Sequence, residues 1–238
     1  DQYQVFRDAK YLLVKTVDLN TVKPGSFVFT QSIFCGEFKG ASKANDGYDV
    51  KLANGTSSDK NSILNLNINV GNSYQGYHCY GLFGVLSGTV ENINIVNAKV
   101  NQDDLTTVKY EEKNAVGTVC GLLVGGKIKD VSVYTDINLQ QGSSTTFLGT
   151  QYVGGICGIA QSGEIINSTT NGTIKSPIYT PTSNNMNVNY SASIGGILGR
   201  AEENDGVKNC LNNIDITAIQ YSSNPGTALR QYLGGVIG

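Results

Sequence analysis

Short apolar segments recur along the chain, and each contains glycine and ends near a polar bend. The copies are YGLFG ending at Gly84, VGTVCG at Gly121, VGGICG at Gly158, IGGILG at Gly199 and LGGVIG at Gly238. Their end points are 37, 37, 41 and 39 residues apart. Self-similarity at a period of about 20 to 50 residues is the sequence signature of stacked repeats.

The segments after each copy predict short strands. A turn precedes a strand in SGTVENINI from Ser87, GGKIKDVSV from Gly125, SGEIINSTT from Ser162 and NDGVKNCLNNIDI from Asn204, and a second short strand follows each. Short strands separated by glycine and asparagine turns, without helix-length segments between them, suit a coil in which each strand pairs with the same strand one coil further on. We therefore predict an all-β fold, a parallel β-helix or β-solenoid with about three short strands per coil.

Stacked coils predict columns of equivalent side chains. Two apolar columns, Leu82–Val119–Ile156–Ile197–Val236 and Val90–Ile128–Ile165–Val207, are the expected core. The glycines that end the five copies should form a third column at one corner, because glycine adopts positive φ without strain. A fourth column is predicted at the following bend, where the side chains would form a ladder of amides or simply act as turn formers. Its members are Asn92, Asp130, Asn167 and Asn209.

We expect a single domain over residues 1–238, with N-terminal coils or a cap over 1–70 and the repeats over 71–238. The chain begins at Asp1 without a methionine. It closes on Gly238, where earlier copies of the motif continue into another strand. Both features predict a fragment of a longer chain.

Charge and hydropathy exclude two classes of partner. The formal net charge is −2 and the basic residues are scattered, so the chain lacks the basic patch that a nucleic-acid partner requires. The apolar runs are short and broken by glycine, so we expect no insertion into a membrane.

Four segments carry a resemblance to a known family. They are YLLVKTVDLN at 11–20, IFCGEFKG at 33–40, SILNLNI at 62–68 and YGLFGVLSGTVENINI at 80–95. Their order resembles that of GLUG-repeat surface proteins, in which a strand ending in Asp-Leu leads to a Gly-x-Phe-x-Gly bend, an Asn-Leu strand and repeated Gly-Leu-Phe-Gly units. The usual Asp-Gly-Asn-Gly bend is replaced by the insertion KGASKANDGYD at 39–49.

The resemblance implies a right-handed β-solenoid in a secreted or wall-attached protein. Proteins of this kind include adhesins, and the repeats also occur in the non-catalytic region of bacterial IgA-cleaving zinc endopeptidases. The resemblance implies little about a ligand.

Candidate catalytic chemistry is sparse. His78 is the only histidine, HExxH is absent, and the cysteines at 35, 79, 120, 157 and 210 are dispersed, so we predict no zinc and no cofactor. Serine or cysteine catalysis would need His78, and adjacent residues such as His78 and Cys79 point to opposite faces of a strand. Glu202, Glu203 and Asp205 are candidate calcium ligands or loop carboxylates, and solvated loop residues are the alternative.

Cys120 and Cys157 should lie on neighbouring coils. A separation of about 4.8 Å between their Cα atoms would permit a disulfide. Neighbouring side chains in a parallel sheet point the same way, however, which strains such a bond, so we predict two buried thiols.

Tyrosine-rich segments are the candidate contact loops. GNSYQGYHCY at 71–80 contains Tyr74 and Tyr77, and IYTPTSNNMNVNY at 178–190 contains Tyr179 and Tyr190. They predict contact with a protein or glycan, or alternatively a cover over the flank of the solenoid. Asn54 and Asn189 lie in glycosylation sequons and are acceptors if the chain passes through a eukaryotic secretory route.

The sequence thus predicts a non-enzymatic extracellular or cell-surface repeat module. It would act as a structural spacer or as a scaffold for adhesion or assembly. Its partners would be proteins or glycans on a surface, or further copies of itself. The alternative is a β-helical polysaccharide-active enzyme that uses loop carboxylates.

Overall fold

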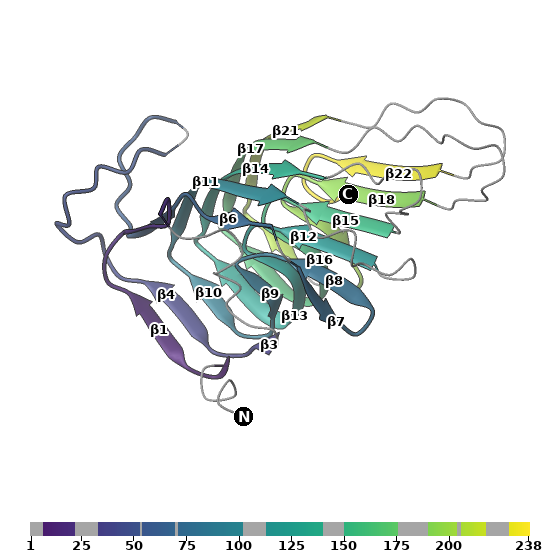
Figure 1. Ribbon diagram of the computed structural model, residues 1–238, viewed down its shortest axis with the longest axis horizontal. Helices are drawn as coiled ribbons and strands as arrows, with labels where there is room; N and C mark the ends of the chain where they lie inside the picture. The colour runs from purple at the N-terminus through teal and green to yellow at the C-terminus, as the bar shows by residue number, and fades with distance from the viewer. Residues whose placement is uncertain are drawn as a thin grey trace.

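The structure is a computed structural model that describes residues 7–21, 33–52, 54–69, 71–101, 113–139, 150–175, 190–203, 206–217 and 229–238. Within these ranges, the strands fall into three sheets of nine, seven and six strands (Figure 1). No helix in the described ranges has the length and apolar character that a membrane crossing requires.

The bounds of the strands follow the recurring motifs. The nine-stranded sheet holds β1 (Lys10–Leu13), β3 (Ile33–Phe34), β4 (Glu37–Gly40), β9 (Phe83–Leu86), β10 (Thr89–Glu91), β13 (Cys120–Lys129), β16 (Cys157–Ile166), β19 (Leu198–Ala201) and β20 (Val207–Lys208). The seven-stranded sheet holds β2 (Val17–Asp18), β5 (Ser62–Leu64), β6 (Asn67–Ile68), β11 (Asn94–Asn101), β14 (Ser132–Asn138), β17 (Thr169–Lys175) and β21 (Leu211–Thr217). The six-stranded sheet holds β7 (Asn72–Tyr74), β8 (Tyr77–Tyr80), β12 (Lys113–Gly117), β15 (Thr150–Gly154), β18 (Tyr190–Gly195) and β22 (Leu229–Gly234).

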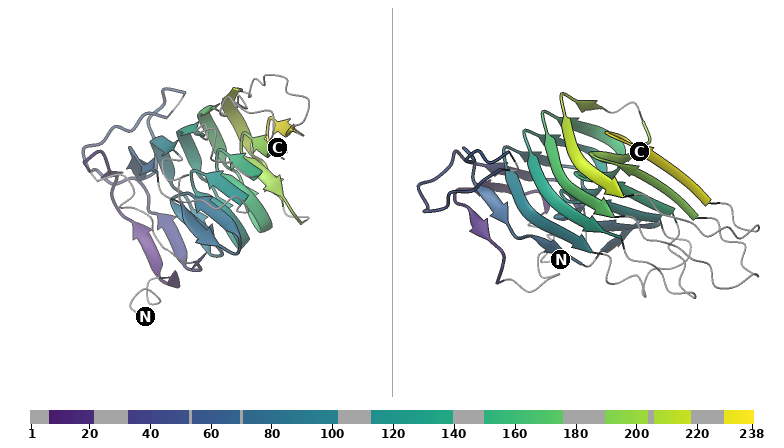
Figure 2. Two further views of the ribbon diagram at one scale, coloured as in Figure 1. Left: turned by 45° about the vertical axis from the view of Figure 1, so that its right-hand side comes forward. Right: turned by 90° about the horizontal axis from the view of Figure 1, so that it is seen from above.

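From β8 onward, the chain visits the six-, nine- and seven-stranded sheets in that order, and we call one such passage a round. Strands of successive rounds lie side by side (Figure 2). They pair in parallel, for example Val116 with Val153 and Cys120 with Cys157. Among the described strands, β7 is the exception, because it pairs antiparallel with β8. The prediction of an all-β fold with parallel strands is confirmed.

The main hydrophobic core lies between the three sheets. The first predicted column, Leu82, Val119, Ile156 and Ile197, is fully buried there, and so are Val90 and Ile128 of the second. Burial decreases in the last members of both columns, because Val207 is only partly buried and Val236 is exposed. The apolar positions of the repeated motif therefore face one shared interior.

The column of corner glycines has a different cause from the one we expected. The register places Gly121 beside Gly158 and Gly158 beside Gly199, but none of the five corner glycines has φ in the left-handed region. A Cβ added to Gly158 would instead lie 2.4 Å from the Val116 nitrogen. One added to Gly199 would lie 2.4 Å from the Val153 nitrogen. Glycine is needed because the nine- and six-stranded sheets meet here backbone to backbone.

Left-handed backbone occurs at the next corner, between the nine- and seven-stranded sheets. Asn92, Asp130, Asn167 and Asn209 have φ of 58°, 53°, 49° and 52°. Asparagine and aspartate tolerate this region better than other side chains do. The amide of each of the first three donates to a carbonyl of the following round, those of Lys129, Ile166 and Lys208. The four residues therefore share the role of turn formers.

A contact between side-chain amides is found at another bend, on the seven-stranded sheet. The Asn97 side-chain amide donates to Asn65 Oδ1, and Asn65 Nδ2 donates to Asp18 Oδ1 over 2.7 Å. Asn65 and Asn97 are both left-handed, each with φ of 57°. This short ladder links successive layers of the N-terminal half of the molecule.

The insertion predicted near residues 39–49 forms an excursion that returns at Asn61. Antiparallel bridges join Ser42 to Lys60 and Lys51 to Ser57. Asn61 is fully buried, and its Nδ2 donates to the carbonyls of Leu13 and Ser42 over 2.8 and 3.2 Å. A buried amide with these bonds anchors the excursion to the sheets.

Candidate functional site

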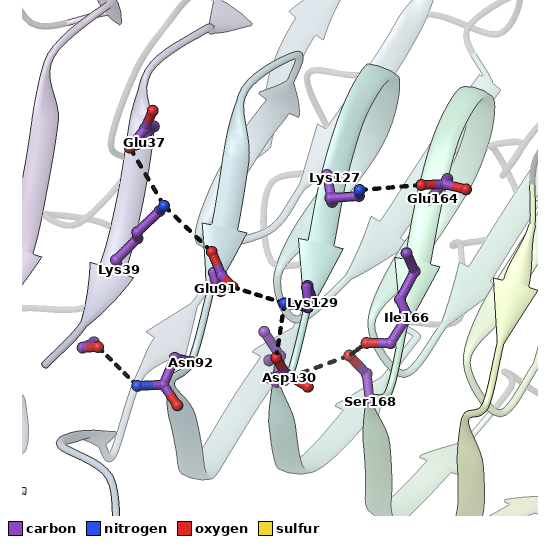
Figure 3. Close-up of polar contacts among 12 residues, drawn as sticks. Glu37, Lys39, Glu91, Asn92, Lys127, Lys129, Asp130, Glu164, Ile166 and Ser168 are labelled. Carbon is purple, nitrogen blue, oxygen red and sulfur yellow. Dashed lines mark hydrogen bonds and ion pairs between the residues drawn. The ribbon is translucent and has the colours of Figure 1, made fainter. Parts of the chain in front are cut away.

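An array of alternating charges lies on the outer face of the nine-stranded sheet (Figure 3). The register of the strands produces this array, because Glu91 pairs with Lys39 on one side and with Lys129 on the other. Lys127 pairs in the same way with Glu164. We call this array the charged strip, and it consists of Lys10, Glu37, Lys39, Glu91, Lys127, Lys129, Asp130, Glu164 and Lys208.

Ion pairs run continuously across one part of the strip. Lys39 Nζ lies 3.5 Å from Glu37 and 3.3 Å from Glu91, and Lys129 Nζ lies 3.0 Å from Glu91 and 3.4 Å from Asp130. In the other part, Glu164 accepts from both Lys127 and Lys208. Glu37, Glu91 and Glu164 therefore each sit beside an ammonium group of a neighbouring strand, and Asp130 sits beside Lys129, which precedes it in the chain.

The contacts shift the pKa values of the strip so that the charged form of each group is favoured. The pKa of Glu91 is lowered, chiefly by the hydrogen bond from Lys129, and that of Glu164 is lowered chiefly by the hydrogen bond from Lys208. The pKa values of Lys39 and Lys129 are raised, in both cases chiefly by a hydrogen bond to Glu91. The strip holds five lysines against four carboxylates, so these charges nearly cancel. It is therefore a poor site for a polyanion.

Acidification should weaken the strip. The pKa of Glu91 in the folded chain lies below the value of 4.5 expected without these contacts. The carboxylate therefore stabilises the fold above that value, and the contribution disappears as the pH falls through the lower, folded pKa. We expect Glu91→Gln to lose less than about 1 kcal/mol of unfolding free energy at neutral pH, because exposed pairs are screened.

Melting temperatures measured from neutral to acidic pH test this expectation. The loss of stability on acidification should be smaller in Glu91→Gln than in the unmodified chain. Glu203→Gln, at an exposed glutamate outside the strip, is the control and should leave the profile unchanged. Identical profiles for the unmodified chain and Glu91→Gln would contradict the assignment.

A second candidate surface surrounds Tyr77 and Tyr152 on the six-stranded sheet. Tyr77 is 7% exposed and Tyr152 is 4% exposed, and both pack into a second hydrophobic cluster outside the main core. Its other buried members are Cys79, Val85, Ala115, Leu122 and Ile159, and Tyr74 packs against it partly buried. Tyr77 thus covers the flank of the stacked sheets, so its ring is not presented to solvent.

Charged side chains lie over both buried rings. Lys113 Nζ lies 5.3 Å from the centre of the Tyr77 ring, and the Arg200 guanidinium lies 5.2 Å from that of Tyr152. Arg200 also donates to the Tyr152 hydroxyl over 3.0 Å, and the Tyr77 hydroxyl donates to Glu202 over 3.4 Å. The groups that solvent can reach are therefore Lys113, Arg200 and Glu202. Together with Tyr77 and Tyr152, we call them the tyrosine cluster.

The chain matches no protein-family model and no curated protein. Among solved structures, a crystal structure of a "putative immunoglobulin A1 protease" from Bacteroides ovatus is similar to it at low level. The match covers 99% of this chain and 82% of the other, with 14% sequence identity and a TM-score of 0.36. At these values it supports no inference about activity or partners. The resemblance to GLUG-repeat proteins remains a prediction from the sequence.

Of the other predicted contact and modification residues, the structure describes Tyr190 and Asn54. Tyr190 begins β18, and Asn54 is exposed in the N-terminal excursion. Tyr179 and Asn189 lie outside the described residues. Asn54 also accepts hydrogen bonds from the backbone and hydroxyl of Thr56, which hold its sequon in a turn.

The structure describes three of the candidate catalytic and metal-binding residues, namely His78, Glu202 and Glu203. His78 is buried, where its ring packs edge-on against Tyr80 and its Nδ1 lies 3.2 Å from the Ser73 hydroxyl. Glu202 lies 3.8 Å from Arg200, Glu203 is exposed, and Asp205 lies outside the described residues. Across the described ranges, no three histidine, cysteine or acidic side chains gather into a metal site.

All five cysteines are free thiols. Cys120 and Cys157 are register partners on β13 and β16, and both are fully buried. Burial raises the pKa of the Cys79 and Cys120 thiols, which keeps them protonated and poorly reactive. They act as small apolar side chains in the two cores.

A row of buried polar side chains on the six-stranded sheet was not predicted from the sequence. Asn114 pairs with His78 on one side and with Gln151 on the other, and all three are buried. In the sequence, these residues look like ordinary polar positions beside insertions. Their alignment becomes visible only once the register of β8, β12 and β15 is known.

Proposed function

We propose that the chain is a non-enzymatic module of an extracellular or cell-surface protein. In this proposal it is a right-handed parallel β-helix of the GLUG-repeat kind that acts as a spacer and adhesion scaffold. The observation that carries the proposal is the in-register stacking of equivalent residues. Val116 pairs with Val153, and Val153 pairs with Ile194, through three successive rounds.

Stacking of this kind suits a spacer because each round contacts chiefly its neighbours. Parallel hydrogen bonds join successive rounds in all three sheets, and each round adds about 4.8 Å of length. The apolar columns run through the same interior, so bending the stack would separate buried side chains. A stiff body whose length grows with the number of rounds is the expected result.

The tyrosine cluster is the face that we propose for adhesion. Lys113, Arg200 and Glu202 offer both signs of charge at the surface, and the buried rings beneath them restrict their positions. Arginine and lysine side chains can donate hydrogen bonds to the hydroxyl or carboxylate groups of a partner. The partner would be a protein or a glycan on a surface.

Small-angle X-ray scattering and glycan binding test the two parts of the proposal. Scattering from the purified chain should fit a rigid stack of the three sheets, and a profile that requires an expanded or flexible particle would contradict the spacer role. On an array of immobilised glycans, polysaccharides and mucins, we expect binding that the double variant Lys113→Ala/Arg200→Ala loses. The matched control Lys127→Ala/Lys129→Ala removes two lysines from the charged strip and should still bind.

The same array distinguishes the alternative function. If the chain instead releases reducing ends from an arrayed polysaccharide, and Glu202→Ala or Glu203→Ala abolishes that release, the polysaccharide-active enzyme is favoured. Binding that is equally strong in the Lys113→Ala/Arg200→Ala variant would remove the tyrosine cluster from the proposal.

A further inference from the structure

Lys113 of the tyrosine cluster is not neutralised, unlike the lysines of the charged strip. Each of the five lysines in the strip lies within 3.5 Å of a carboxylate. Lys113 is exposed, and none of the ion pairs between described residues involves it. Its ammonium group instead lies 5.3 Å from the centre of the Tyr77 ring. The positive charge of Lys113 is therefore available to a ligand.

The Arg200 guanidinium is only partly neutralised. Its Nε lies 3.8 Å from Glu202 Oε1, which is a longer separation than those within the charged strip, and its Nη1 donates to the Tyr152 hydroxyl over 3.0 Å. A guanidinium carries five N–H donors, and these two contacts use two of them. The tyrosine cluster thus holds two cations and one carboxylate, on a chain whose formal net charge is −2. It is a locally positive site with hydrogen-bond donors to offer.

The register of the strands holds the two cations on one face. Lys113 pairs with Tyr77 on one side and with Thr150 on the other. Tyr152 follows Thr150 by two residues, so its side chain lies on the same face of the sheet as that of Lys113. Arg200 reaches the Tyr152 ring from β19 of the nine-stranded sheet. Both cations therefore belong to strands, and the positions of strands are more precise than those of loops.

The layer beneath these charges is apolar. Val85, Leu122 and Ile159 belong to the same hydrophobic cluster as the two tyrosine rings, and all three are fully buried. Charges beside a layer of low dielectric constant attract an ion more strongly than charges that water surrounds on all sides. An anion at the tyrosine cluster would therefore be held more strongly than one beside an isolated lysine.

Glu202 limits the kind of anion that fits. Its side chain is 25% exposed and accepts a hydrogen bond from the Tyr77 hydroxyl over 3.4 Å. A ligand with many negative charges, such as a sulfated chain or a run of acidic residues, would bring like charges against Glu202. A sugar carboxylate brings one negative charge, which matches the fork of Arg200, and the hydroxyl groups beside it can donate to Glu202. The cluster therefore fits a sugar that carries one carboxylate and free hydroxyl groups.

We propose that the tyrosine cluster binds an acidic sugar, with Lys113 and Arg200 holding its carboxylate and Glu202 accepting hydrogen bonds from the adjacent hydroxyl groups. The inference rests on the proposed adhesive function and deepens it by naming the class of ligand. Uronic acids and sialic acids both carry a carboxylate beside hydroxyl groups, so the experiment has one arm for each.

Biolayer interferometry with immobilised sugars tests the proposal. The probes are glucuronic acid and sialic acid, each presented as a single terminal sugar on a neutral carrier, and the methyl ester of each. We expect the chain to bind at least one acid about tenfold or more tightly than its ester, because the ester lacks the charge. Lys113→Ala and Arg200→Ala should each weaken that binding by a similar factor. The matched control Lys127→Ala/Lys129→Ala should bind as the unmodified chain does.

Glu202→Gln provides a second test, in which a gain of binding is expected and misfolding cannot imitate the result. Without the carboxylate, binding to dextran sulfate should increase severalfold over the weak binding expected of the unmodified chain. An unchanged response to dextran sulfate would contradict the role assigned to Glu202.

Three results of the sugar-binding experiment overturn the proposal. They are equal binding of each acid and its methyl ester, binding to polyglutamate as strong as that to the acids, and binding of the acids that survives Lys113→Ala/Arg200→Ala. Equal binding of acid and ester that still requires Lys113 and Arg200 would leave the adhesive function intact. The failure of this inference is therefore distinguishable from the failure of the proposed function.

Discussion

Replacing Gly158 with alanine should lower the free energy of unfolding by more than about 3 kcal/mol. The new Cβ would lie 2.4 Å from the Val116 nitrogen and 2.7 Å from the Gly121 oxygen. Both are backbone atoms within paired strands, so neither can move without disturbing the hydrogen bonds of β12 or β13. Urea unfolding followed by circular dichroism measures the change.

Gly235→Ala is the matched control for this substitution. Gly235 belongs to the fifth copy of the same motif, and a Cβ added there would meet no atom within 4 Å. We expect a change within about 0.5 kcal/mol, as for most surface substitutions. Equal losses in the two variants would show that glycine's conformational entropy, and not the close approach of two sheets, explains the column.

Phe83→Ala should cost about 3 to 5 kcal/mol of unfolding free energy. The Phe83 ring is fully buried, stacks on Phe34 with ring centres 4.6 Å apart, and meets Phe38 edge-on at 5.8 Å. These three rings join the N-terminal strands to the first full round. Truncation would leave a cavity in a part of the core where three strands of the nine-stranded sheet converge.

Tyr134→Ala provides the comparison for the aromatic truncation. Tyr134 lies on β14 with 41% of its surface exposed, so its removal should change stability by less than about 1 kcal/mol. Both variants should unfold with the denaturant dependence of the unmodified chain, because the surface exposed on unfolding is nearly the same. A loss for Phe83→Ala no larger than that for Tyr134→Ala would contradict the role assigned to the aromatic contacts.

The repeated motif was sufficient to predict strand pairing but not the reason for its glycines. Short strands separated by glycine and asparagine turns predicted the all-β class and the parallel pairing, since no helix-length pattern competes with them. Positive φ was expected at the glycine corner and occurs at the asparagine corner instead. A local rule places glycine wherever φ is positive, whereas the close approach of Gly158 to Val116 depends on two sheets meeting in space.

The contacts in the charged strip and in the tyrosine cluster could not be predicted from the sequence. Glu91 and Lys129 are 38 residues apart, and their ion pair exists because β10 and β13 align them. Tyr77 and Glu202 are separated by 125 residues. The sequence signal for the strip is an alternation of lysine and glutamate at outward positions of strands, which becomes informative only when the register is known.

By itself, the sequence determined the class of structure, the strand segments and the side chains of the main core. Periodicity and turn chemistry act over a few residues, so they can be read along the chain. Only the tertiary structure decided which side chains meet across sheets and why glycine is required at Gly158. These features depend on distances between backbones that are remote in sequence, and those distances follow from the packing of three sheets around a common interior.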